Sequence, residues 1–459
     1  MRNHMIYWQQ ISGGALGLLL LLSAVVRAAD WPSWGGPDRN GISSEVGWRT
    51  DWNTASPRVL WQAKLSGSKL TSLRFMQTST CAVAKGRLFI YSADPRANDP
   101  KVYDFTLLCL DALTGKELWR HAVPSTAQTI RLFPQAPVVD GDSVYMYSPD
   151  GMLEQLRAAD GAVIWSNDLC KTINARPILG KDGIRSSPLI VNGLLMVPVL
   201  CRPGGKDADV VAVRVTDGSL VWASSQPSAR LAHGASNWQT LTLATINGKA
   251  QVIYLAGSKV VGINIADGST LWEFQIPKED ILVNAEKDIT DIAVDASPTV
   301  DGNAVTFSYS RGHAFGMTFC IEIDAANKTS VRWRNEDVYN WKHSFILHQG
   351  CLYGFNQQFL LEIGGTTVCM DPKTGAIAWE GKLAGEMILA DGKLIIWDGE
   401  RLHLVKASPK AFEEIAVTKP MPATGKPHPK WAGSYTPILA NGLIYCRNEI
   451  GDLFCVDVR

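Results

Sequence analysis

Short apolar runs along the chain alternate with turns that contain glycine, and in five places tryptophan follows the glycine four residues later. An apolar run, a turn ending in glycine and a second apolar run predict an antiparallel hairpin, because glycine supplies the positive φ of the last turn position. Side chains alternate between the faces of a strand, so each tryptophan should take an equivalent position on its outgoing strand. The five copies are Gly115–Trp119, Gly161–Trp165, Gly218–Trp222, Gly268–Trp272 and Gly375–Trp379.

A hairpin repeat of roughly 40 to 50 residues predicts a β-propeller rather than strand tryptophans that coincide in a sandwich. We expect an all-β fold: an eight-bladed β-propeller of four-stranded antiparallel blades. The inner strand of each blade is a short apolar run that leads into a turn with glycine. These segments are Cys81–Gly86, Pro137–Gly141, Pro188–Gly193, Leu241–Gly248, Pro298–Gly302, Phe345–Gly350, Met387–Gly392 and Pro437–Gly442.

The ends of the repeat array predict how the ring closes. The last repeat stops after its third strand, 453–458, and a lone strand with a tryptophan, 59–65, precedes the first blade. We expect this N-terminal strand to complete the last blade, because a closed ring removes sheet edges that invite aggregation. Two repeats are irregular: the turn before Trp333 has one extra residue, and Ile415 stands where blade 7 would carry tryptophan.

Composition fits one large ring and excludes one class of partner. Basic and acidic residues number 44 each, so the chain has no net positive charge for a nucleic acid. With 459 residues, 46% hydrophobic and 19% charged, the chain can bury a large core. Strands such as 210–215 are apolar on both faces, which stacked blades require because each blade is covered on both sides.

Residues 1–28 are typical of a secretory signal peptide. Arg2 precedes an apolar stretch from Ile11 to Val26, and small residues predict cleavage after Ala28. An uncleaved membrane anchor is the alternative, although the stretch is slightly short for a span. We expect an exported chain, periplasmic or extracellular, with no transmembrane segment after cleavage.

The exported chain should comprise an N-terminal extension, 29–57, and the propeller, 58–459. No cysteine follows the apolar stretch directly, so the lipobox of an envelope lipoprotein is missing. The nine cysteines show no zinc spacing, which makes a structural metal site unexpected. Their placement favours buried thiols over disulfides, because three occupy matching strand positions: Cys109, Cys369 and Cys455.

The repeat, in the form Leu108–Trp119, resembles that of the pyrroloquinoline quinone (PQQ) type propellers, and the resemblance covers Arg58 to Arg459. The segment Trp31–Gly41 is similar to the opening of secreted bacterial members. That fold includes quinoprotein dehydrogenases and the non-catalytic BamB propeller of the outer-membrane β-barrel assembly machinery. The resemblance implies that a tryptophan docks between adjacent blades, here Trp61, Trp119, Trp165, Trp222, Trp272, Trp333 and Trp379.

For an enzyme, the resemblance implies a quinone stacked on a central tryptophan, a calcium ion with carboxylate and amide ligands, and an aspartate base. Many alcohol-oxidising members also carry two adjacent cysteines, and this sequence has no such pair. Asp295 is a candidate base, although an aspartate before a buried strand is more often a turn residue. No spacing selects calcium ligands. We therefore expect no cofactor, and a PQQ- and calcium-dependent alcohol or sugar dehydrogenase is the alternative function.

Loops that join one blade's outer strand to the next inner strand should rim a central funnel. They carry cations and aromatics that suit an anionic, sugar or peptide ligand, or that serve as solvated charges and capping rings. We expect a non-catalytic, monomeric binding or assembly scaffold for an unknown envelope protein, peptide or glycan, and a carbohydrate-binding propeller is the third interpretation. The funnel candidates are Arg74, Arg131, Arg185, His233, Trp238, Asp295, Trp341, His343 and Trp431.

Overall fold

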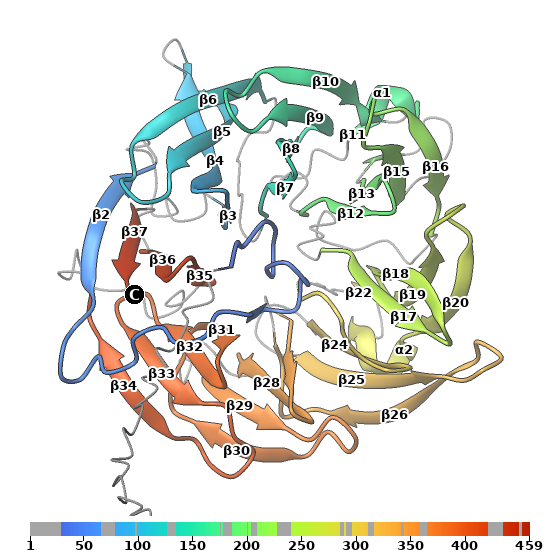
Figure 1. Cartoon of the computed structure of the whole chain (residues 1–459). Coiled ribbons are helices and arrows are strands. Elements are labelled where there is room, and N and C mark those ends of the chain that lie inside the picture. Colours follow the sequence, from blue (N-terminus) through green and yellow to red (C-terminus); the bar gives the residue numbers. More distant parts are fainter. Residues whose placement is uncertain are drawn as a thin grey trace, which may run out of the picture.

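Eight antiparallel sheets of four strands stand around one axis and form the ring of Figure 1. The predicted eight-bladed, all-β propeller is confirmed. The computed structural model of the chain describes residues 29–65, 79–96, 99–125, 135–174, 176–177, 186–199, 201–202, 209–226, 240–284, 289–290, 296–310, 316–340, 344–357, 365–420, 435–448 and 452–459. Within these ranges, no helix is both long and apolar enough to cross a bilayer.

In blades 1 to 7 the four strands follow chain order from the axis outward, and blade 8 takes its outer strand from near the start of the chain (Figure 1). Blade 1 contains β3 (Ala82–Ala84), β4 (Arg87–Arg96), β5 (Asp99–Asp111) and β6 (Glu117–Pro124). Blade 2 contains β7 (Val138–Asp140), β8 (Ser143–Tyr147), β9 (Met152–Arg157) and β10 (Val163–Asp168). Blade 3 contains β12 (Leu189–Val191), β13 (Leu194–Pro198), β15 (Val210–Arg214) and β16 (Leu220–Ser224). Blade 4 contains β17 (Thr242–Ile246), β18 (Lys249–Ala256), β19 (Lys259–Asn264) and β20 (Thr270–Gln275).

The second half of the ring repeats this order. Blade 5 contains β23 (Thr299–Asp301), β24 (Ala304–Ser310), β25 (Gly316–Ile323) and β26 (Thr329–Asn335). Blade 6 contains β27 (Ile346–His348), β28 (Cys351–Asn356), β29 (Thr366–Met370) and β30 (Ile377–Gly381). Blade 7 contains β31 (Glu386–Ala390), β32 (Lys393–Trp397), β33 (Leu402–Lys406) and β34 (Glu414–Thr418). Blade 8 contains β35 (Ile438–Ala440), β36 (Leu443–Arg447), β37 (Asp452–Asp457) and β2 (Arg58–Lys64).

A few short elements lie outside the four-stranded repeat. β1 (Ile42–Ser43) joins blade 7 as a fifth strand on the axial side, parallel to β31. The others are α1 (Leu169–Thr172), α2 (Lys278–Ile281), the pair β11 (Arg176–Pro177) with β14 (Cys201–Arg202), and the pair β21 (Leu282–Asn284) with β22 (Ile289–Thr290).

The ring closes as the sequence predicts, with the N-terminal strand β2 as the outer strand of blade 8. β2 runs antiparallel to β37, so that Arg58 lies opposite Asp457 and Lys64 opposite Asp452. The Nε2 of Gln62 donates to Oδ2 of Asp452 at 2.8 Å. Both edges that an open ring would expose are therefore paired within the chain.

The turn chemistry inferred from the repeat is present in the structure. Gly115 has φ 70°, and the pairing of β5 with β6 shifts register between Cys109 and Leu110, which is the bulge that follows such a turn. Blade 5 has no glycine in this turn, and Asn327 takes the left-handed conformation at φ 62°. Asparagine is one of the few residues that tolerates that region at modest cost.

The hydrophobic core lies between blades rather than within one layer. Phe89 and Cys109 of blade 1 share a cluster with Val144 and Leu156 of blade 2, and all four are fully buried. Cysteine serves here as a small apolar residue. The cysteines whose side chains are described are all buried: Cys81, Cys109, Cys170, Cys320, Cys351, Cys369, Cys446 and Cys455.

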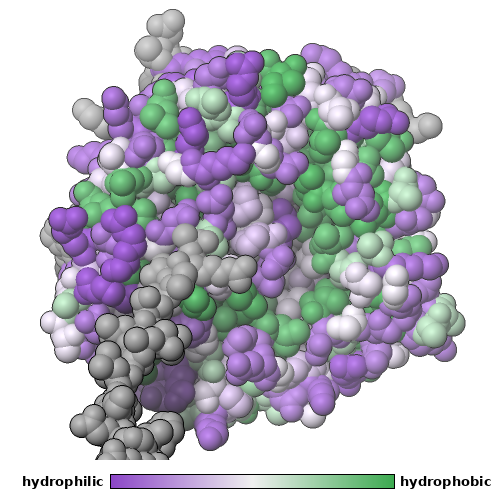
Figure 2. Space-filling view, viewed as in Figure 1, coloured by the Kyte–Doolittle hydropathy of each residue, from purple (hydrophilic) through white to green (hydrophobic). Residues whose placement is uncertain are grey.

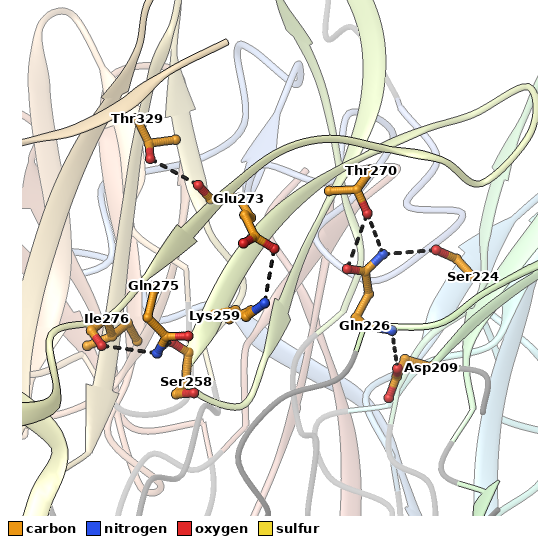
Figure 3. A network of polar contacts seen from close by, with 10 residues as sticks. All are labelled: Asp209, Ser224, Gln226, Ser258, Lys259, Thr270, Glu273, Gln275, Ile276 and Thr329. Carbon is orange, nitrogen blue, oxygen red and sulfur yellow. Dashed lines mark hydrogen bonds and ion pairs between the residues drawn. The ribbon is translucent and has the colours of Figure 1, made fainter.

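Polar contacts join the blades along the outer part of the ring (Figure 3). The Nε2 of Gln226, at the end of blade 3, donates to Ser224 Oγ in its own blade and to Thr270 Oγ1 in blade 4, at 3.0 and 2.9 Å. On the far side of blade 4, Thr329 Oγ1 of blade 5 donates to the carbonyl of Glu273 at 3.0 Å. Each seam is thus held by side chains as well as by apolar contact.

The antiparallel order gives the ring two different faces. One face, the turn face, carries the tight turns that hold Gly86 and Gly115; the opposite face, the loop face, carries connections such as 148–151 and 398–401. The outer strands end on the loop face, and the inner strands begin there. Figure 2 shows hydrophilic residues over most of the rim and apolar residues nearer the centre.

Candidate functional site

The N-terminal extension enters the centre of the ring, where Figure 1 shows it crossing between the inner strands. We call residues 29–45 the plug. Trp31 pairs with Val83 of β3 through two backbone hydrogen bonds, of 2.8 and 2.7 Å. The carbonyl of Pro32 then accepts from the Val139 backbone of β7 at 2.8 Å. The plug therefore uses inner-strand donors and acceptors of two neighbouring blades.

The plug returns along blade 7 and is anchored at blade 8. Its strand β1 runs parallel to β31, and the carbonyl of Gly41 accepts from the Leu389 backbone at 2.9 Å. The buried carboxylate of Glu45 accepts from the backbones of Asn441 and Gly442, in the turn between β35 and β36. Burial raises the pKa of Glu45, and these backbone hydrogen bonds act in the opposite direction.

Between these two anchors, residues 33–41 form a compact tip. The backbone of Gly41 donates to the carbonyl of Gly35 at 2.9 Å, and Ser33 Oγ donates to the carbonyl of Gly36 at 2.7 Å. A Cβ on Gly35 would lie 2.8 Å from the backbone of Arg39, so only glycine fits this turn. Arg39 itself has φ 55°, a left-handed conformation that non-glycine residues adopt at a cost.

Arg39 carries its guanidinium across the axis toward blade 3. Its Nη1 donates to the carbonyl of Pro188 at 2.9 Å. Its Nε and Nη2 are buried and have no hydrogen-bond partner among the described residues, although part of the side chain is exposed. Burial lowers the pKa of Arg39 to about 9, which leaves the group charged at neutral pH.

A cavity of about 30 Å³ lies at the tip of the plug, and we call it the tip cavity. Thr80, Ser344 and Thr436 line it from the ring, and each directly precedes an inner strand, so the cavity is on the loop-face side of the channel. Trp31 and Arg39 line it from the plug. Two further buried groups of this lining have no partner among the described residues, Trp31 Nε1 and Thr80 Oγ1.

The seven tryptophans expected to dock between blades all lie on outer strands, and six donate their indole Nε1 to a carbonyl of the following blade. Five of their rings also lie over the turn glycine of that blade, where a Cβ would approach to 2.5–2.6 Å. The glycine therefore leaves room for the ring as well as forming the turn. The six bonds run from Trp61 to Ala112, Trp119 to Ala158, Trp165 to Val215, Trp222 to Ile265, Trp333 to Pro372 and Trp379 to Ser408.

The funnel candidates taken from the sequence lie outside the described residues, so they stay predictions. These are Arg74, Arg131, Arg185, His233, Trp238, Asp295, Trp341, His343 and Trp431. The tip cavity was missed, because the sequence identifies Trp31–Gly41 only as an N-terminal extension. Its available signal was one arginine among tryptophans and glycines, a composition typical of a tight loop that packs against a surface.

The described residues do not fit the quinone and calcium that the fold implies for an enzyme. Calcium takes six to eight oxygen ligands, and in the described part of the chain no three His, Cys, Asp or Glu side chains gather as they would around a metal ion. At the axis the plug instead places the cation of Arg39, beside a cavity of about 30 Å³ that is too small for a fused-ring quinone. No chemical step is derived through either group.

Comparisons with known proteins agree with this architecture. A chain from Yersinia pestis named outer membrane protein assembly factor BamB is 24% identical over 262 residues, which are 55% of this chain and 58% of the relative. The protein of the same name from Burkholderia pseudomallei is 25% identical over 211 residues, 39% of this chain and 51% of the relative. This chain thus spans little more than half the length of the curated relatives it matches.

The crystal structure of BamB from Moraxella catarrhalis has the same fold. It superposes with a TM-score of 0.56 over 87% of this chain and 99% of that one, at 12% sequence identity. The sequence model of the family described as outer membrane protein assembly factor BamB matches residues 43–232 and 103–381. The two matched ranges together cover most of the ring, and the chain therefore belongs to that family.

Proposed function

We propose that this protein is a non-catalytic propeller that acts as a binding and assembly scaffold in the cell envelope. The observation that carries the proposal is the plugged axis of the ring: residues 29–45 bind the inner strands of blades 1, 2, 7 and 8. A ring whose channel holds its own chain offers partners its faces and rim rather than a route through the centre.

The loop face is the side we assign to the partner. Tryptophans and side-chain hydrogen bonds hold the blades together in a closed ring. The ring is therefore a rigid frame for the connections on this face. Loops on a rigid frame commonly carry recognition, whereas the tight turns of the opposite face have little room to vary. The partner is an envelope protein, a peptide or a glycan.

Family membership supports the same proposal. The curated relatives carry the name outer membrane protein assembly factor, and that name describes them. Extended to this chain, the name supports a location outside the cytoplasm, in line with the signal peptide inferred for residues 1–28. It also makes a protein of outer-membrane assembly the first partner to test.

Site-specific photo-crosslinking in the source bacterium tests the proposal. A crosslinking amino acid is placed at Asp337 or Arg401, which are exposed on the loop face, and at Lys116 or Lys373, which are exposed on the turn face. We expect an outer-membrane assembly component to be captured from the loop-face positions and not from the turn-face positions. Lys116 and Lys373 are matched controls, since they sit at equivalent turns of blades 1 and 6.

Two results of the crosslinking would contradict the proposal, the first its assignment of a face and the second its partner. Equal capture from both faces would contradict the assignment of the partner to the loop face. Absence of capture at all four positions, with the protein intact, would contradict an envelope partner. Stoichiometric binding of PQQ in the presence of calcium, measured by calorimetry on the purified chain, would instead favour the dehydrogenase. The crosslinking and the calorimetry are independent, so each can fail alone.

A further inference from the structure

Residues that line the tip cavity carry buried hydrogen-bond donors without an acceptor. Four buried polar atoms of these residues have no partner in the described part of the chain: Nε and Nη2 of Arg39, Nε1 of Trp31 and Oγ1 of Thr80. Three of these atoms are N–H donors only, and the threonine hydroxyl can donate as well. Most buried polar groups in folded proteins are hydrogen-bonded, so such a group of unsatisfied donors points to a missing acceptor.

The two free nitrogens of Arg39 define the shape of that acceptor. Nε–H and Nη2–H lie on one edge of the planar guanidinium, and their hydrogens run parallel. Nη1, on another edge, is already bound to the carbonyl of Pro188. A free edge of this kind matches the two oxygens of a carboxylate, which it binds through two parallel hydrogen bonds.

The size of the cavity selects a small group. One water-sized atom needs about 10–15 Å³ of such volume, and the tip cavity has about 30 Å³. The space therefore suits the two oxygens of one carboxylate and excludes a ring or a long side chain. It lies on the loop-face side of the channel, because Thr80, Ser344 and Thr436 each precede an inner strand there.

The charge of the lining is one-sided. No aspartate or glutamate is among the described residues that line the cavity, so the cation of Arg39 has no counterion there. An unpaired buried charge is costly, and it is retained where something compensates it. The left-handed backbone of Arg39, at φ 55°, adds a conformational cost at the same residue.

We propose that the tip cavity is a binding site for a carboxylate group, held side-on by Nε–H and Nη2–H of Arg39 with Trp31 Nε1–H and Thr80 Oγ1–H as further donors. The carboxylate belongs either to a small free acid or to the end of a peptide chain that enters from the loop face. The site goes beyond the scaffold function and does not depend on it, because a small acid binds without any envelope partner.

Calorimetric titration of the purified chain with sodium formate, at constant ionic strength set by sodium perchlorate, tests the site. We expect one formate per chain, and we expect Arg39→Gln to weaken binding about ten- to a hundredfold, since a hydrogen bond to a charged group contributes about 1.5–3 kcal/mol. Thr80→Val and Trp31→Phe each remove one donor and should weaken binding by a smaller factor. Arg401→Gln, an exposed arginine away from the cavity, is the control and should bind formate as the parent does.

Arg39 also holds the plug against Pro188, so the folded state of each variant is checked by circular dichroism, and Thr80→Val carries the test if Arg39→Gln fails to fold. Tri-alanine with a free or an amidated carboxyl end then separates the two sources. Tighter binding of the free peptide than of formate assigns a chain end, and binding of formate alone assigns a free acid. Absence of formate and peptide binding, or equal formate affinity in the parent and Thr80→Val, would overturn the proposal.

Discussion

The indole Nε1 of Trp272 donates to Oε1 of Gln251 within its own blade, at 2.6 Å, whereas the other six docking tryptophans donate to the next blade. The next blade here is blade 5, whose turn has Asn327 in place of the usual glycine. The seam between blades 4 and 5 is held instead by an amide pair, in which Asn303 Nδ2 donates to Asn247 Oδ1 at 2.7 Å. The repeat of indole hydrogen bonds between blades is therefore interrupted at the seam between blades 4 and 5.

Replacing Gln251 by methionine should destabilise the protein by about 1–3 kcal/mol, because the buried indole N–H of Trp272 loses its acceptor. Urea unfolding followed by tryptophan fluorescence gives the change. In a Trp272→Phe background the same replacement should cost about 1 kcal/mol less, because the donor is already gone. Equal costs in both backgrounds would show that the pair is not coupled.

Gly161→Ala should destabilise by about 2–5 kcal/mol. Its φ is +76°, and a Cβ would lie 2.6 Å from Cε3 of Trp119. The left-handed conformation costs about 1–2 kcal/mol for a residue with a Cβ, and overpacking adds about 1–3 kcal/mol. Gly141→Ala is the matched control, since its φ is +59° and nothing lies within 4 Å of its Cβ position. Similar shifts of the thermal unfolding midpoint in the two variants would show that the contact with Trp119 adds no cost.

Trp119→Ala should cost about 3–5 kcal/mol, as expected for the loss of a large side chain packed between blades. Its ring lies against Phe89, with centroids 5.9 Å apart, and its Nε1 donates to Ala158 of the next blade. Leu118→Ala, at the neighbouring position that is 44% exposed, should cost about 0.5 kcal/mol or less. Calorimetric melting of both variants checks the ranking, which a loss below about 1 kcal/mol for Trp119→Ala would contradict.

Stability should depend on pH through His403, a side chain that bridges Asp398, 3.1 Å from its Nε2, and Glu414. Burial acts to lower the pKa of His403, but the two carboxylates outweigh it and raise the pKa above 6.5. A raised pKa means that the folded state binds the proton more tightly than the unfolded state. The stabilisation is then fully present below about pH 6.5 and is lost as pH rises through the folded pKa.

The test of this titration is a comparison of the parent with His403→Gln by denaturant unfolding at several pH values. The difference in free energy of unfolding between the two should shrink from about pH 6 to pH 8.5. Other histidines titrate in both proteins and cancel in the difference. A difference that is constant over this range would mean that His403 does not change its charge on unfolding. The pKa of Asp398 is lowered below 3.8 despite its burial, so its own contribution changes only in more acidic solution.

Much of the fold can be predicted from the sequence because each blade repeats the same local chemistry. The spacing from Gly115 to Trp119 fixes a turn, a bulge and the position of a side chain, and those are short-range properties. Ring closure also follows by counting strands, because the lone strand 58–64 matches the missing outer strand of blade 8. The second role of the glycine could not be predicted, since Trp119 reaches Gly161 only when two blades stack.

The site was much less predictable. Arg39 meets Pro188 across 149 residues of sequence, and Glu45 meets Gly442 across 397. No periodicity encodes contacts at such separations. The segment Trp31–Gly41 has neither the alternation of a strand nor the spacing of a helix. Its path into the axis depends on which backbone N–H and C=O groups of the inner strands are still unpaired once the ring has formed. The funnel residues chosen from loops rest on composition, and they stay predictions.

The closure of blade 8 also determines when the ring can be completed during synthesis. Of the strands that make up the four-stranded blades, β2 is synthesised first and β37 last. Gln62 and Asp452, which bond across this junction, are 390 positions apart. Bringing such distant segments together has an entropic cost that grows only as the logarithm of the separation, but it must be met before the junction stabilises anything. Glu45, at the end of the plug, shares this timing, because it binds a turn of the same last blade. Until translation ends, β2 and Glu45 both lack these partners, so a chaperone that protects nascent strands would have its longest task at the start of this chain.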